Sequence, residues 1–191
     1  MKKAKANSKF WLKFAKIGIA IMFCFGIFVA GFFVIRAKIY PKKYLNEINV
    51  YATKYNLAPS LVASVVNTES SFNKNARSSK GAIGLMQVKL STAKYMIDLY
   101  NLNLTIDENE LFEINNNLNF GCMYLRYLIN KFLDVNTALA SYNAGETIVR
   151  YWLKDEKYSS NGKTLKTIPY NETENYVKKI NRNLKYYKKV M

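Results

Sequence analysis

The sequence predicts a mainly α-helical protein in which one transmembrane helix precedes a single exported domain. Two observations lead to this prediction. Residues 17–35 form an apolar run without a charge, and apolar residues elsewhere recur at helical spacings of three and four rather than in the alternation typical of strands. Half of the 191 residues are apolar and 15% are aromatic, which is enough for a packed core in one domain of this length.

The apolar run of residues 17–35 is long enough to cross the ~30 Å hydrocarbon core of a bilayer as a helix. More basic residues precede the run than follow it, so the positive-inside rule places the N-terminus in the cytoplasm. We expect a basic cytoplasmic tail over residues 1–16, a single-pass signal anchor in the cell membrane over 17–35, a short linker over 36–43 and an extracytoplasmic domain over 44–191. A cleaved signal peptide is the alternative, but the run exceeds a usual signal-peptide core and no A-x-A-like cleavage site follows it.

Composition excludes several classes of chemistry. Histidine is absent, which removes Ser-His and Cys-His nucleophile pairs and the commonest metal ligand. The two cysteines, Cys24 and Cys122, are too few for a metal cluster, and Cys24 lies inside the apolar run, so we expect no disulfide. We therefore expect no metal and no cofactor, and chemistry that relies on carboxylates, hydroxyls, amides or lysine.

The net charge of +16 is unevenly distributed along the chain. Residues 1–43 contain ten Lys or Arg and no acid, so much of the charge flanks the apolar run. Neither zinc-finger spacing nor basic-zipper heptads accompany the charge, and we expect no nucleic-acid partner.

The first helices of the domain follow from spacing and from proline. An amphipathic stripe predicts one helix through Tyr44, Ile48, Tyr51 and Tyr55. Pro59 suits the first turn of the next helix, whose inward face carries Val62, Val65, Val66 and Glu69.

Later elements follow in the same way. Ser91 or Thr92 is expected to cap a third helix, and the acids after Thr105 to begin a fourth. A longer helix is expected around residues 118–132, two short helices at 137–142 and 147–153, and a loop with a short hairpin at 154–168. A last helix over 172–189 is expected to turn Tyr176, Ile180, Leu184 and Tyr187 inward and Lys178, Lys179, Lys185 and Lys188 outward.

Glu69 is a candidate general acid because of the helix face on which it lies. A carboxyl group pressed against apolar side chains resists ionisation, so its pKa should rise. A raised pKa would keep the group protonated near neutral pH, ready to donate to a leaving oxygen. The alternative is a solvated, inert glutamate at a frayed helix end.

The residues that follow resemble the signature of a known family. Residues 69–88, ESSFNKNARSSKGAIGLMQV, resemble the motif of the soluble lytic transglycosylase (SLT) domain, a goose-type-lysozyme-like fold with a cleft that acts on peptidoglycan. Lys74 and Leu90 replace two usual prolines. NLNFGCMYL, ALASYNAG and IPYNETENYV resemble later family motifs in the same order, and the resemblance covers about residues 41–185.

The resemblance implies cleavage of the β-1,4 bond between N-acetylmuramic acid and N-acetylglucosamine, with formation of a 1,6-anhydromuramoyl end and Glu69 as the single acid and base. It also implies a set of substrate-binding residues: Ser78, Met86, Gln87, Tyr142, Asn143, Glu172 and Tyr176. Of these, Met86 is expected as an apolar floor under a sugar ring. Ser78 is expected either to bind Glu69 or the N-acetyl group, or merely to cap a loop. Glu146 is expected to be solvated.

Two other functions stay open at the level of sequence. A muramidase would hydrolyse the same bond with the same glutamate. A membrane-tethered module without catalytic activity would bind glycan as part of a wall-spanning assembly. Peptidoglycan strands and the membrane are the expected partners, and other cell-wall proteins are further candidates.

Overall fold

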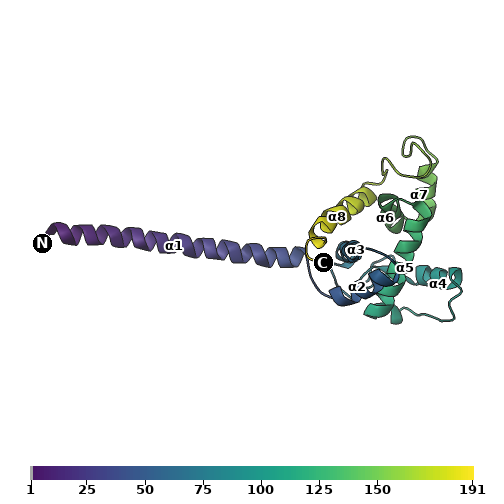
Figure 1. Ribbon diagram of the computed structural model, residues 1–191, viewed down its shortest axis with the longest axis horizontal. Coiled ribbons are helices and arrows are strands. Elements are labelled where there is room, and N and C mark those ends of the chain that lie inside the picture. The colour runs from purple at the N-terminus through teal and green to yellow at the C-terminus, as the bar shows by residue number, and fades with distance from the viewer. Residues whose placement is uncertain (1) are drawn as a thin grey trace. The chain divides into compact units, whose positions relative to one another are not determined.

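The computed structural model describes residues 2–191, without the side chains of residues 2–15, 17, 19 and 20. The chain divides into two units, one up to Tyr40 and one over Pro41–Met191. The first unit is a single helix, α1 (Lys2–Ile39) (Figure 1). Its segment Ile21–Ile39 has a mean hydropathy of 1.9 and is long and apolar enough to cross a membrane, a property that signal sequences share. The predicted basic tail, apart from Lys16, has side chains outside the described residues.

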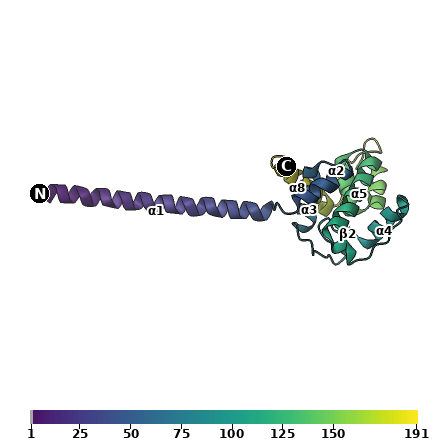
Figure 2. The same cartoon turned by 60° about the horizontal axis from the view of Figure 1, so that its bottom comes forward.

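The second unit is mainly helical, as predicted, and is organised around α3 (Pro59–Ser70). Pro59 lies in the first turn, as expected from the sequence. The sequence predicted one buried face, but every residue from Ser60 to Asn67 is buried. The reason is that α3 packs against both α2 (Leu45–Lys54) and α8 (Asn171–Tyr187), so it is a central helix rather than a surface helix (Figures 1 and 2).

A short hairpin follows α3 where the sequence indicated a loop. Strand β1 (Ala82–Ile83) pairs antiparallel with β2 (Val88–Lys89), with Ala82 opposite Lys89 and Ile83 opposite Val88. The turn between the strands has left-handed backbone at Gly84, with φ 73°, and at Gln87, with φ 50°. The hairpin therefore presents residues 84–87 as a tight turn of fixed shape.

The side chain of Asn117 fixes this turn through hydrogen bonds to backbone groups. It is fully buried, and Nδ2 donates to the carbonyl oxygens of Ile83 and Leu111, both at 2.8 Å. Oδ1 accepts from the Met86 backbone N–H at 2.8 Å. A Cβ at Gly84 would collide with Nδ2, so glycine is required there both for its φ and for this close approach. Two of these bonds attach the hairpin to α5 (Ile114–Phe132), and the third attaches Leu111.

The segment between the hairpin and α5 differs from the sequence prediction. Helix α4 (Leu90–Leu99) starts directly after β2 with Lys89 as its N-cap, so Ser91 and Thr92 lie inside the helix and do not cap it. The acids after Thr105 begin only a 3₁₀ turn, η1 (Glu110–Phe112). The side chains of Asp107 and Glu110 each accept from the other's backbone N–H at 2.8 Å. This reciprocal pair stabilises the start of the short turn, and the longer helix that the sequence indicated does not form there.

The C-terminal third follows the prediction more closely. Helices α6 (Val135–Ala144) and α7 (Glu146–Leu153) flank Gly145, and α8 buries Tyr176, Ile180 and Tyr187 while Leu184 is half-buried. The loop before α8 contains no strand among the described residues, because Ser159 and Asn161 bond to the backbone of residues 162–164 instead.

One lysine of the last helix is an exception. The sequence placed Lys179 on the outward face, but it is only half-exposed, and its Nζ donates to the Thr68 carbonyl at 3.3 Å.

Replacement of Asn117 by alanine should destabilise the domain strongly. Asn117→Ala leaves the buried Met86 N–H and two carbonyls without their partner, and each such group costs about 1–3 kcal/mol. We expect the free energy of unfolding of the full chain in detergent, measured with urea, to fall by roughly 3 kcal/mol or more. Asn115→Ala, the same change at an exposed position of α5, is the control and should have little effect. Equal losses from both variants would contradict this role.

Candidate active site

Glu69 lies in the last turn of α3, where its partly buried carboxyl group faces α8. The Tyr176 hydroxyl donates to Glu69 Oε1 at 2.6 Å, and Tyr176 itself is buried with 8% of its surface exposed. Tyr176 thus holds one oxygen of the carboxyl group and leaves the other for a further partner.

The surroundings of Glu69 favour its protonated form. Burial raises the pKa of the carboxyl group from 4.5 to about 7, although the Tyr176 hydrogen bond and the positive charge of Lys179 act in the opposite direction. Burial also raises the pKa of Tyr142 and Tyr176 well above its ordinary value, and the neighbouring Glu69 adds to both shifts. Glu69 can therefore exchange a proton near neutral pH beside two phenols that stay protonated.

A polar cavity of about 180 Å³ lies between the hairpin, α4, α5 and the end of α6. It brings together three of the residues predicted to bind substrate, Gln87, Tyr142 and Asn143. The lining residues are Gln87, Val88, Lys89, Thr92, Tyr124, Tyr142, Asn143, Ala144 and Gly145. None of them is an acid, so any carboxylate chemistry at this cavity has to come from outside its lining.

Gln87 and Tyr142 are both fixed by hydrogen bonds to backbone. Gln87 Nε2 donates to the carbonyl oxygens of Ala76 and Gly84, at 3.2 and 3.0 Å. The Tyr142 hydroxyl donates to the Met86 carbonyl at 2.8 Å and so joins α6 to the hairpin. Because the amide hydrogens of Gln87 are engaged, its Oε1 is the atom that it can offer to a ligand.

Asn143 and Glu172 lie on the exposed side of the same region. Asn143 Oδ1 accepts from the Thr173 hydroxyl at 2.7 Å, which connects the end of α6 to the first turn of α8. Glu172 is exposed in that first turn, where an acid stabilises a helix N-terminus. The structure places Glu172 outside the lining of the polar cavity.

Two expected binding residues have structural positions instead. The Met86 side chain is fully buried against Gly121 and Cys122, so it cannot form an apolar floor under a sugar ring in this conformation. Ser78 Oγ accepts from the Ala82 backbone N–H at 3.0 Å, and its own N–H donates to the Ala82 carbonyl at 2.9 Å. Ser78 therefore caps the loop before β1, the second of the two roles expected for it.

A row of tyrosines extends from the cavity and was not predicted as part of the site. Tyr124 contacts Tyr142 with ring centroids 5.4 Å apart and stacks on Tyr127 at 6.1 Å, and Tyr95 meets Tyr127 edge-on at 5.8 Å. The spacing of Tyr124 and Tyr127 on one side of α5 is a signal that could have indicated this row.

Glu146 is ion-paired rather than solvated, which corrects the prediction. Its carboxylate contacts Lys131 at 2.6 Å and Arg150 at 3.6 Å, and accepts from the Tyr127 hydroxyl at 2.9 Å. Burial opposes ionisation of Glu146, but hydrogen bonds from Lys131 and Tyr127 and the nearby positive charges outweigh it and lower the pKa. Glu146 is thus a stable anion that ties α7 to α5, unlike Glu69.

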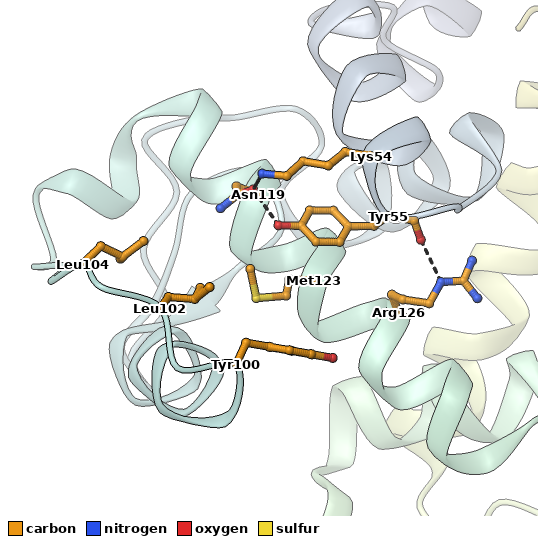
Figure 3. A pocket seen from close by; sticks show the side chains of 8 residues that line it. All are labelled: Lys54, Tyr55, Tyr100, Leu102, Leu104, Asn119, Met123 and Arg126. Carbon is orange, nitrogen blue, oxygen red and sulfur yellow. Dashed lines mark hydrogen bonds between the residues drawn. The ribbon is translucent and has the colours of Figure 1, made fainter.

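A second, larger cavity of about 460 Å³ lies away from these residues, between α2, α5 and residues 100–104 (Figure 3). Lys54 and Tyr55 both donate to Asn119 Oδ1 at its edge, and Tyr100, Leu102, Leu104 and Met123 supply apolar walls. No carboxylate and none of the predicted site residues lines this cavity. Nor do three His, Cys, Asp or Glu side chains gather anywhere in the described part of the chain so as to hold a metal ion.

Comparisons with known proteins agree with this geometry. Residues 46–166 match the transglycosylase SLT domain. The chain is 29% identical to soluble lytic murein transglycosylase of Salmonella typhimurium over 80% of its length, and 30% identical to membrane-bound lytic murein transglycosylase C of Yersinia enterocolitica over 77%. The crystal structure of the 70 kDa soluble lytic transglycosylase of Escherichia coli is similar with a TM-score of 0.69, at 28% identity over 80% of this chain and 25% of that one.

The relatives are longer than this chain. It spans 24% of the Salmonella protein and 47% of the Yersinia protein. The shared part contains the helix that carries Glu69, the hairpin, the tyrosine row and the turn at Gly145. The chain belongs to the transglycosylase SLT domain family, and its homologues are lytic murein transglycosylases.

Proposed function

We propose that the protein is a lytic transglycosylase that cleaves the β-1,4 bond between N-acetylmuramic acid and N-acetylglucosamine in peptidoglycan and leaves a 1,6-anhydromuramoyl end. The observation that carries the proposal is the Glu69 carboxyl group, whose pKa burial raises to about 7 and which interacts electrostatically with Tyr142, a residue that lines the polar cavity. Membership of the family supports peptidoglycan as the substrate.

In the first half of the proposed reaction, Glu69 acts as the acid. The protonated carboxyl group gives its proton to the glycosidic oxygen as the bond from that oxygen to C1 breaks. The N-acetyl carbonyl of the substrate stabilises the positive charge that develops at C1. Tyr176 positions the carboxyl group through its bond to Oε1.

In the second half, the same group acts as the base. The Glu69 carboxylate removes the proton of the C6 hydroxyl as that oxygen attacks C1, so the glutamate ends as it began and no water is consumed. This cycle requires one carboxyl group rather than two. Gln87, Tyr142 and Asn143 are proposed to contact the sugars at the polar cavity, with Tyr124 and Tyr127 extending the aromatic surface.

We further propose that α1 anchors the protein in the membrane with the domain on the outer side. The length and apolar composition of Ile21–Ile39 support a spanning helix, and the relative from Yersinia is named as membrane-bound. The excess of lysines before the apolar run supports a cytoplasmic N-terminus.

The anchor is tested by fractionation of cells that express the full chain. We expect the protein to stay in the membrane pellet after alkaline carbonate extraction and its intact mass to include α1. External protease should remove the domain from spheroplasts and leave a tail-containing fragment. A soluble product that starts after the apolar run would instead identify a cleaved signal sequence.

The reaction is tested by mass analysis of sacculi digested with the full chain in detergent. We expect anhydromuramoyl ends, and we expect Glu69→Gln to lower the rate by at least about a hundredfold because an amide cannot donate the required proton. Glu174→Gln, which removes a half-exposed acid of α8 that pairs with Lys178, is the control and should keep the activity.

Three outcomes of this digestion would contradict the proposal in different ways. Reducing muramic acid ends in place of anhydro ends would identify a muramidase. Full activity of Glu69→Gln would exclude Glu69 as the acid. Binding to sacculi without any released product would indicate a glycan-binding module.

The pH dependence gives an independent prediction. The first step needs protonated Glu69, so kcat/KM should fall about tenfold per unit as pH rises above about 7. The Tyr176 hydrogen bond lowers the pKa of Glu69, so Tyr176→Phe should move this alkaline limb to higher pH. Its kcat should fall roughly 10- to 100-fold because the carboxyl group loses its orientation. Tyr151→Phe, at an exposed position of α7, should change neither. If the alkaline limb of kcat/KM does not move in Tyr176→Phe, the assignment of this limb to the ionisation of Glu69 is refuted.

A further inference from the structure

Helix α3 ends in an electrostatically unfavourable way for a carboxylate. The C-terminal end of a helix carries a partial negative charge, which cations in the last turn usually offset. The last turn of α3 contains no basic residue, yet it holds Glu69. An anion at this position is therefore disfavoured both by burial and by the carbonyl groups of its own helix.

Helix α8 supplies the missing cation from outside. Lys179 Nζ donates to the carbonyl oxygen of Thr68, the residue before Glu69, at 3.3 Å. One turn further along α8, Asn183 Nδ2 donates to the Thr68 hydroxyl at 3.0 Å. Both contacts meet at Thr68, so the ammonium group of Lys179 is held at a fixed place against the end of α3.

The neighbouring lysine has a different environment. Lys178 is exposed, and its Nζ pairs with the Glu174 carboxylate at 2.8 Å along the surface of α8. In the described part of the chain, Lys179 forms no ion pair in which its Nζ lies within 4.0 Å of a carboxylate oxygen. Its charge is thus not neutralised locally and acts on the end of α3.

We propose that Lys179 is a positioning residue for the lytic reaction, whose fixed charge at the end of α3 makes the carboxylate form of Glu69 available as the base. This inference rests on the proposed function. The acid step requires a protonated Glu69, and the base step requires that the carboxylate, once formed, is tolerated at a buried helix end. A lysine on the Thr68 carbonyl stabilises that second form without occupying the polar cavity.

The other titratable groups that face Glu69 cannot play this part. Tyr176 reaches it from α8 and Tyr142 from α6, and both phenols stay neutral because burial and Glu69 raise their pKa. Among the described groups that act on Glu69, Lys179 brings the positive charge, and this charge lowers the pKa of Glu69 against the effect of burial. Removal of the charge should therefore raise that pKa.

The test compares pH profiles of kcat/KM on sacculi for full-length variants in detergent. In Lys179→Met we expect the alkaline limb to move to higher pH by roughly 0.2–0.7 unit, the effect of a partly exposed charge pair. At neutral pH we expect kcat to fall and KM to change by less than about twofold, because Lys179 does not touch the substrate. Lys179→Arg keeps the charge and should restore the wild-type limb. High salt should reduce the difference between wild type and Lys179→Met.

Lys178→Met is the matched control, since it removes the same charge from the adjacent position of α8, and its profile should coincide with that of wild type. The inference is overturned if Lys179→Met leaves the limb in place, if both methionine variants shift it equally, or if KM alone rises. Lys179→Gln, which retains a hydrogen-bond donor for Thr68, gives the same readout should Lys179→Met not fold. If the wild-type protein shows no activity that depends on Glu69, the proposed function is refuted. If the wild type is active but the alkaline limb of Lys179→Met does not move, only this inference is refuted.

Discussion

The hydrogen bond between Tyr176 and the Glu69 carboxyl group joins parts of the chain that are 107 residues apart, and the site depends on it. It requires α8 to pack along α3, which in turn requires the buried residues of both helices to interlock. The same packing removes the carboxyl group from water and raises its pKa to about 7. The packing of α8 on α3 therefore both contributes to the core and raises the pKa of Glu69.

The candidate site draws on three segments of the chain. Helix α3 carries Glu69, the hairpin carries Gln87 and the Met86 carbonyl, and the end of α6 carries Tyr142. Asn117 of α5 and Tyr142 of α6 both hold the hairpin turn through hydrogen bonds to its backbone. Backbone groups thus do much of the positioning, which explains why residues without chemical reactivity, such as Gly84 and Gly121, are close neighbours of the site.

Features that depend on local spacing could be predicted from the sequence. Pro59 indicated the start of α3, the two short helices expected at 137–142 and 147–153 indicated a boundary between α6 and α7, and the periodicity of α8 indicated that Tyr176 faces inward. The apolar face around Glu69 was enough to predict the direction of its pKa shift. These signals act within one or two helical turns, so no tertiary information was needed.

Features that depend on a distant partner could not be predicted. Lys179 looked like part of a solvated face because nothing local reveals the Thr68 carbonyl opposite it. Glu146 looked solvated because Lys131 and Tyr127 come from α5, and Met86 looked like a cleft residue although Gly121 leaves room for it in the core. In each case another helix supplies what determines the position of the side chain: a carbonyl group for Lys179, a positive charge for Glu146 and space in the core for Met86.

The protonation of Glu69 can be measured directly by carboxyl ¹³C NMR of the full chain in detergent, with labelled glutamate and with Glu69→Gln to assign the signal. We predict a titration midpoint near pH 7, well above the ordinary glutamate value of 4.5. A midpoint near 4.5 would mean that Glu69 is an ordinary anion at neutral pH, and it would contradict the claim that burial prepares it as an acid.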